Sequence, residues 1–204
     1  MKILITGFEP FGSSSINPSE QVVLALQGQT IGGAKLLTEV LPVDSQRGPQ
    51  ALLETLQSRQ PDGVLCLGEA AQRPVISIER IAINLLDYRI PDNAGHQVFN
   101  EPVVPDGPAA YFATIPVRKI HQVLLETGIP AELSLSAGTY LCNQVMYRLL
   151  HFINTNRLSI QAGFIHLPAL PQQAAHQQTI QPSMSLETSL SGVRTAIAVM
   201  TGNY

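Results

Sequence analysis

Short apolar segments of the chain alternate with segments whose apolar residues recur at helical spacing. Strands are expected at residues 2–6, 35–43, 63–68, 75–84, 131–136 and 162–168, and helices at 17–28, 45–60, 116–128, 141–153 and 185–200. This alternation is typical of an α/β sandwich, in which helices cover both faces of a sheet. We therefore predict a three-layer α/β fold around a mostly parallel, twisted sheet. Ligands of such folds bind at the carboxyl ends of the strands.

Two segments carry further local signals. In residues 75–84 the alternation puts Ile76, Ile78 and Ala82 on one face of a single strand, and Glu79 on the other. The helix after residue 16 has Asn17 at the N-cap position and Pro18 at its first position. The first signal predicts one strand with two different faces, and the second predicts where the helix begins.

Length and charge bound the class of protein. The 204 residues suit one domain, 1–204, and a net charge of −3 offers no electrostatic reason to expect nucleic acid or an anionic membrane as partner. The longest apolar runs are far shorter than a membrane span, and the first residues enter a turn too early for a signal peptide. The two cysteines are too few for a disulfide scaffold. We expect a cytoplasmic protein.

Cys142 stands where a predicted strand, a small-residue turn and a helix meet. It shares a helix face with Val145 and Met146, so it could be a small buried residue at the start of an apolar stripe. It also falls in the first helical turn, where unpaired N–H groups favour a reactive thiolate. Cys66 lies in the middle of a strand and is expected to be inert core.

A cysteine nucleophile needs a base and a group that orients the base. His166 is the only histidine predicted at the same sheet edge as Cys142. The candidate orienting acids are Glu9, Glu69, Glu79, Asp87 and Asp92. Glu79 replaces an apolar residue on a strand face, so it needs a partner there, which an arginine could supply as well as a histidine. The pattern leaves those two possibilities equal.

Other chemistry is less well supported by the sequence. No spacing typical of a metal site occurs. The loop "GFEPFG" lacks the Lys-Ser/Thr pair that ends a phosphate-binding P-loop. Its two phenylalanines form either a hydrophobic plug or an aromatic wall for a flat ligand. The turn-rich residues 89–110 are expected to form a lid or binding loop.

Several motifs resemble those of the pyroglutamyl peptidase I family, from one end of the chain to the other. They are "TGFEPFG…NPS", "IERIAIN", "DYRIPDNAGHQ", "DGPAAYFATIPV", "SAGTYLCN", "GFIHLP" and "PSMSLE". The resemblance implies a cytosolic cysteine peptidase that removes an N-terminal pyroglutamyl residue from peptides, without cofactor. It also implies a phosphorylase/hydrolase-like α/β sandwich, often assembled as a homotetramer.

The resemblance assigns roles residue by residue. It places the nucleophile at Cys142, the histidine at His166 and the acid at Glu79. The substrate-binding residues that it implies are Phe8, Phe11, Glu69, Arg89, Ile90 and Tyr140. Of these, Glu69 departs from the family pattern, since some bacterial members have a glutamine there that is thought to bind the lactam. A carboxylate accepts from the ring N–H but adds a charge that the neutral ring does not need.

Two other functions are compatible with the residues alone. A different cysteine amidase on this scaffold predicts little preference for a lactam. A binding protein without activity predicts that Cys142 resists alkylation at neutral pH.

Overall fold

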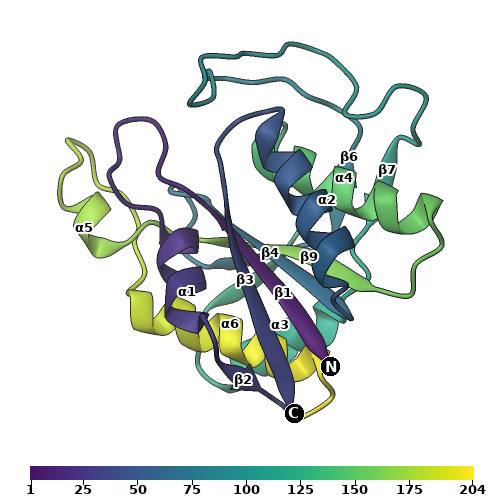
Figure 1. Cartoon of the computed structure of the whole chain (residues 1–204). Coiled ribbons are helices and arrows are strands. Elements are labelled where there is room, and N and C mark those ends of the chain that lie inside the picture. The colour runs from purple at the N-terminus through teal and green to yellow at the C-terminus, as the bar shows by residue number, and fades with distance from the viewer.

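The computed structural model describes residues 1–204 and contains a seven-stranded sheet with helices on both faces (Figure 1). The strands, in the order β2-β3-β1-β4-β9-β5-β8, are β2 (Thr30–Ile31), β3 (Ala34–Leu41), β1 (Lys2–Phe8), β4 (Gly63–Glu69), β9 (Gln161–Leu167), β5 (Ile76–Glu79) and β8 (Ala131–Ser134). Within this seven-stranded sheet, only the β2–β3 and β5–β9 pairs are antiparallel. The prediction of an α/β fold around a mostly parallel sheet is confirmed.

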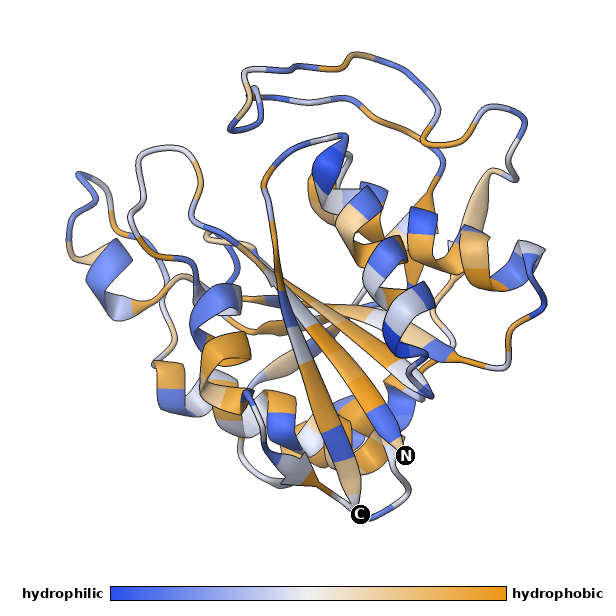
Figure 2. Ribbon diagram, in the orientation of Figure 1, coloured by the Kyte–Doolittle hydropathy of each residue, from blue (hydrophilic) through white to orange (hydrophobic).

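Helices form the outer two layers. One face of the sheet is covered by α1 (Pro18–Leu26), α3 (Val117–Glu126) and α6 (Leu186–Met200), and the other by α2 (Arg47–Arg59) and α4 (Leu141–Thr155) (Figure 1). Each side has its own apolar core, toward which the helices turn their hydrophobic residues (Figure 2). Along β4, Leu65 and Leu67 belong to the first core while Val64 and Cys66 belong to the second, because successive side chains of a strand point to opposite faces. The prediction that Cys66 is core is confirmed.

The start of α1 follows the predicted signals. Asn17 is the N-cap, and its Oδ1 accepts a hydrogen bond from Ser19 N at 2.9 Å. Pro18 occupies the first helical turn, where its missing N–H costs nothing. The Asn17 amide also donates to Glu9 O at 3.1 Å, which ties the helix start to the loop that follows Phe8, the last residue of β1, and that carries Phe11.

The prediction of one strand over residues 75–84 is wrong, because the backbone changes partners at Arg80. Its N–H donates to Ser134 O of the central sheet, whereas its C=O accepts from Ala113 N. The chain therefore leaves the central sheet after β5 and continues as β6 (Ile81–Ile83), which pairs with β7 (Ala110–Phe112) in a separate two-stranded sheet. The change of sheet puts Ala82 in the core on the opposite side from Ile78.

Three short elements were not predicted: β2, β7 and α5 (Pro171–Ala174). Residues 89–109 form the expected long loop, drawn in teal above the sheet in Figure 1. None of the helices combines the length and the apolar character needed to cross a membrane.

Candidate active site

Cys142 is the second residue of α4 and follows a tight turn. Gly138 in this turn has a φ of 79°, in the left-handed region that favours glycine. The N-cap residue, Tyr140, makes no side-chain hydrogen bond to the helix, so its first N–H groups have no side-chain cap. The cysteine is partly exposed, unlike the fully buried Cys66. The cysteine therefore lies in the first turn of a helix whose first backbone donors have no side-chain cap.

His166 and Glu79 meet where β9 pairs with β5. Ser77 is the register partner of His166, and Glu79, two residues further along β5, lies on the same face as Ser77. Glu79 Oε1 lies 2.7 Å from His166 Nδ1, and the two side chains are 0% and 6% exposed. Because Glu79 and His166 are this close in a buried site, the carboxylate can hold the imidazole in one tautomer and orientation.

Arg73 completes this group, and sequence reasoning had not singled it out. Its Nη1 donates to Glu79 Oε1 at 2.6 Å, and its Nη2 donates to Ser136 O at 2.9 Å. Glu79 thus contacts both an arginine and a histidine, the two partners that the sequence left open. The ion pair offsets the cost of burying the carboxylate. The sequence signal that could have identified Arg73 was an arginine six residues before a carboxylate on a predicted buried strand.

Gly68 neighbours both the strand residue His166 and the sulfur of Cys142. It is the register partner of His166 in the parallel pair of β4 and β9, where neighbouring strands lie about 4.8 Å apart. A Cβ on Gly68 would stand 2.9 Å from Cys142 Sγ and 2.8 Å from the ring of Phe164. The absence of a side chain at position 68 therefore lets the sulfur approach the strand that carries His166.

The Cys142 thiol is not acidified in the free protein, contrary to the prediction from its place at a helix start. Burial raises its pKa to about 12, and the negative charges of Glu79 and Glu69 act in the same direction. The positive charge of Arg73 acts against them, but it is the weaker effect. A helix N-terminus contributes up to about 2 kcal/mol, which does not offset desolvation of a thiolate here. The thiol is protonated at neutral pH.

A small apolar cavity opens beside the sulfur. Its volume is about 50 Å³. The residues that line it are Phe8, Phe11, Asn17, Val43, Glu69, Tyr140, Leu141 and Cys142. We call it the inner pocket. Its aromatic and aliphatic walls suit a small flat group, and four of the six expected substrate-binding residues lie here.

A wider groove, which we call the outer groove, leads away from the inner pocket. Its volume is about 580 Å³, and Cys142 and His166 both line it. The two remaining expected residues, Arg89 and Ile90, border it on their exposed loop. Phe11, Glu69 and Tyr140 line both spaces. The structure therefore brings every expected substrate-binding residue to one continuous site.

Glu69 lies at the boundary between the two spaces. Gln173 Nε2 donates to both of its carboxylate oxygens, at 3.1 Å each. Burial raises the pKa of Glu69, and the hydrogen bond from Gln173 partly counteracts this effect. A charged or chargeable acceptor thus faces an otherwise apolar pocket.

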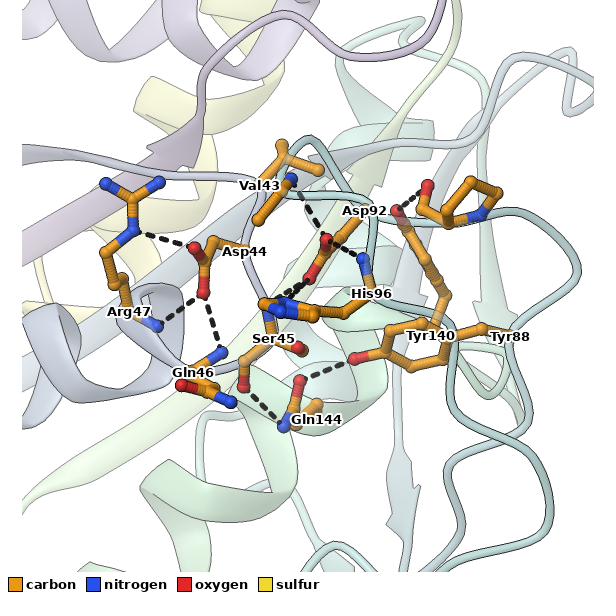
Figure 3. A network of polar contacts seen from close by, with 12 residues as sticks. Val43, Asp44, Ser45, Gln46, Arg47, Tyr88, Asp92, His96, Tyr140 and Gln144 are labelled. Atoms are coloured by element: carbon orange, nitrogen blue, oxygen red, sulfur yellow. Dashed lines mark hydrogen bonds and ion pairs between the residues drawn. The ribbon is translucent and has the colours of Figure 1, made fainter.

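The loop over the site is fastened by Asp92, whose side chain is fully buried (Figure 3). Asp92 Oδ2 accepts from Ser45 N at 2.7 Å, and Oδ1 accepts from Ala94 N and His96 N at 3.0 and 2.8 Å. Burial opposes the charged form, yet these backbone donors outweigh it and lower the pKa of Asp92. The loop therefore stays attached to the turn between β3 and α2.

Tyr140 adds a second attachment between this loop and the site. Its hydroxyl donates to Pro91 O at 3.1 Å, and its ring packs edge-on against Tyr88 with centroids 4.5 Å apart. Tyr88 in turn donates to Gln144 Oε1 at 2.7 Å, on the same helix as Cys142 (Figure 3). These contacts hold the wall of the inner pocket in place.

None of the remaining candidate acids forms a hydrogen bond or ion pair with His166, and two of the other histidines have partners elsewhere. Glu9 Oε1 accepts from Val43 N, and Asp87 lines the outer groove without contacting His166. His121 contacts Ala131 O, and His151 contacts Tyr111. No group of three or more histidine, cysteine, aspartate or glutamate side chains is arranged to hold a metal ion. Among the acids, only Glu79 reaches His166.

Known proteins resemble this chain over almost its whole length. A family described as pyroglutamyl peptidase matches residues 1–203. The pyrrolidone-carboxylate peptidases of Coprothermobacter proteolyticus and Pyrococcus furiosus are 45% and 46% identical, each over 98% of this chain and 96% and 97% of their own.

Solved structures agree with these relatives. A mutant pyrrolidone carboxyl peptidase from Pyrococcus furiosus superposes with a TM-score of 0.95 at 46% identity, covering 98% of both chains. The pyroglutamyl peptidase I of Bacillus amyloliquefaciens reaches the same TM-score at 38% identity, over 98% of this chain and 97% of its own. With its fold, its site and its full-length relatives in agreement, the chain belongs to the pyroglutamyl peptidase family.

Proposed function

We propose that Cys142, His166 and Glu79 remove the N-terminal pyroglutamyl residue from peptides through an acyl-enzyme intermediate. The observation that carries the proposal is the 2.7 Å contact between Glu79 Oε1 and His166 Nδ1, beside a groove that the Cys142 side chain also lines. A nucleophile and a base that line one groove, with a buried acid that orients the base, are the parts that acyl transfer requires.

The nucleophile forms by transfer of the thiol proton to His166, because the thiol is not acidic on its own. Because the pKa of Cys142 is raised to about 12, the sulfur keeps its proton until His166 accepts it. With Nδ1–H donating to Glu79, Nε2 of His166 is free to take the thiol proton. The sulfur then bonds to the carbonyl carbon that links pyroglutamate to the next residue, and the oxygen of that carbonyl becomes an oxyanion.

The oxyanion is stabilised by backbone donors. The first N–H groups of α4, beside Cys142, lack a side-chain cap and carry the positive end of the helix dipole. His166 then gives its proton to the departing amine as the carbon–nitrogen bond breaks. A water molecule, deprotonated by His166, attacks the thioester and releases pyroglutamate and the thiol.

Recognition of the lactam depends on the inner pocket. Phe8, Phe11 and Tyr140 supply apolar surface for the ring, and Glu69 accepts a hydrogen bond from the ring N–H. An ordinary peptide N-terminus carries an ammonium group, which would lose its hydration in this small cavity at high cost. The rest of the peptide leaves along the outer groove, past Arg89 and Ile90.

A panel of N-terminally blocked peptides tests this function. Hydrolysis of pyroglutamyl peptides, with little hydrolysis of acetyl or free N-termini, is expected, whereas another cysteine amidase would show no such preference. Cys142→Ala should abolish turnover while the circular dichroism spectrum stays unchanged. Residual turnover by this variant, or a wild type that binds but cleaves none of the panel, would reject the proposal.

The setting of the enzyme is part of the same proposal. The segments of the site are spread from Phe8 to Gln173, which supports one peptidase domain over residues 1–204.

Two free cysteines suit the cytoplasm, where thiols stay reduced. The family resemblance supports a homo-oligomer, a tetramer, for which the groove of about 660 Å³ lined by exposed Phe112 and Leu158 offers an apolar surface. Light scattering at several protein concentrations measures the assembly.

A further inference from the structure

Gln173 is buried although it belongs to a short polar helix. In α5 its neighbours Pro171 and Gln172 are exposed, whereas Gln173 is 8% exposed (Figure 2 shows the hydrophilic colouring of this helix). Burying a side-chain amide is unfavourable unless its hydrogen bonds are satisfied. Its partners therefore indicate why it is placed inside.

The amide of Gln173 joins three segments of the chain. Its Oε1 accepts from Leu170 N at 2.8 Å, just beyond the end of β9. Its Nε2 donates to Ser14 Oγ at 3.1 Å and to Ile16 O at 3.2 Å, in the loop after β1. The third contact is with Glu69 at the end of β4, at 3.1 Å to each oxygen.

These three segments carry parts of the site. The loop after β1 supplies Phe11 to the inner pocket, and β9 supplies His166 to the outer groove. Glu69 itself lines both spaces. A role confined to capping α5 would need only the contact to Leu170, the N-cap residue of that helix, because the other three partners lie in other segments.

The geometry points to Gln173 as a positioning residue for lactam recognition: its amide turns the Glu69 carboxylate toward the inner pocket and fixes the Phe11 loop against it. This inference rests on the proposed function, in which Glu69 accepts from the ring N–H. Gln173 does not contact the substrate and acts through Glu69.

The charge of Glu69 depends on this contact. Donation by Gln173 lowers the pKa of Glu69 against the effect of burial. The other titratable or charged groups that share a pocket with Glu69 are Arg73, Asp87, Arg89, Tyr140, Cys142, His166 and His176. Of the groups near it, Gln173 alone donates a hydrogen bond to its carboxylate.

A double-mutant cycle that exchanges the carboxylate and the amide between positions 69 and 173 tests the inference. Gln173→Glu places two carboxylates at hydrogen-bond distance, so the variant should bind 2-pyrrolidinone, the bare lactam ring, about tenfold more weakly at pH 7.5. The penalty should shrink as the pH falls, because a shared proton restores a donor to the pair. Glu69→Gln combined with Gln173→Glu restores one donor and one acceptor, and its affinity should return to within about threefold of Glu69→Gln alone.

Three controls separate positioning from folding and from catalysis. Gln172→Glu makes the same charge change at an exposed neighbour in α5 and should leave binding unchanged. Gln173→Leu keeps the volume without a donor; it should raise KM for a pyroglutamyl arylamide and the pKa of Glu69 measured by carbon-13 NMR. The kcat of Gln173→Leu for the same arylamide should stay within about threefold of wild type, since Cys142, His166 and Glu79 are untouched.

The results of this cycle have one reading each. Weaker lactam binding by Gln173→Glu, with recovery in the double variant, supports positioning. Wild-type affinity in both Gln173 variants, or no recovery in the double variant, overturns it. A wild type that does not cleave pyroglutamyl substrates at all would instead overturn the proposed function, so the two failures are distinguishable.

Discussion

The Cys142 sulfur lies 2.9 Å from the point at which Gly68 would carry a Cβ. Real Cβ atoms almost never approach another heavy atom this closely, so any side chain at position 68 displaces the sulfur, the Phe164 ring or both. The register partner of Gly68 is His166. The approach of the Cys142 sulfur to the strand next to β9, which carries His166, therefore depends on the absence of a side chain at position 68.

Gly68→Ala should thus damage catalysis. The extra methyl is expected to move the sulfur away from its attack geometry and to lower kcat by about 10–100-fold, with a loss of stability of about 1–3 kcal/mol. Steady-state kinetics and urea denaturation measure the two effects. Gly63→Ala in the same strand is the matched control, because a Cβ there meets no atom closer than 3.5 Å. Wild-type kcat in Gly68→Ala would contradict the argument.

Replacing Glu79 tests how the imidazole is held. Glu79→Gln keeps the shape of the side chain but removes the charge that His166 and Arg73 both contact. We expect kcat to fall on the order of 10³-fold with little change in KM, since a carboxylate both orients the imidazole and stabilises its protonated form.

Glu132→Gln serves as the control for Glu79. Glu132 accepts a hydrogen bond from Ser77 Oγ at 2.7 Å and lies on the neighbouring strand, β8. Its kcat should match that of wild type. A Glu79→Gln variant within about threefold of wild type would rule out the orienting role.

The charge of Glu69 should be visible in the titration of Cys142. The carboxylate helps raise the pKa of the thiol, because a nearby negative charge opposes formation of the thiolate. Glu69→Gln removes that charge, so the thiol pKa should fall and the alkylation rate should begin its rise at lower pH. Iodoacetamide kinetics in a Cys66→Ser background measure this pKa. An unchanged or upward-shifted profile would be incompatible with this coupling.

Asp44 is predicted to make stability depend on acidic pH. Burial opposes its charged form, but hydrogen bonds from the backbone and side chain of Arg47 and from Gln46 N lower its pKa from 3.8 to about 2. A carboxyl whose folded pKa is depressed stabilises the fold above its unfolded pKa, and this contribution is lost as the pH falls from about 4 to about 2.

Asp44→Asn should therefore unfold more easily at neutral pH, by about 2 kcal/mol, and the difference from wild type should shrink toward pH 2. Urea denaturation at several pH values gives both quantities. Glu101→Gln, at an exposed position, should match wild type throughout. A penalty for Asp44→Asn that does not change with pH would exclude the titration of this carboxyl as its source.

The sequence by itself determined the main strands and helices, and it determined that the candidate site residues Cys142 and His166 stand at the ends of such elements. Apolar periodicity predicted the main strands and helices, and the Asn17–Pro18 signal predicted the start of α1, because capping involves residues that are close along the chain. The same local order placed Cys142 at a helix start and His166 at a strand end. The family motifs then singled out Glu79 from the other acids.

Tertiary structure alone decided the contacts between distant residues. Arg80 changes sheets because its N–H and C=O find partners in different segments, and Gln173 meets Glu69 across 104 positions of the chain. The protonation state of Cys142 was decided in the same way. A helix start is visible in the sequence, but the burial and the neighbouring carboxylates that hold its pKa near 12 exist only after the chain has folded.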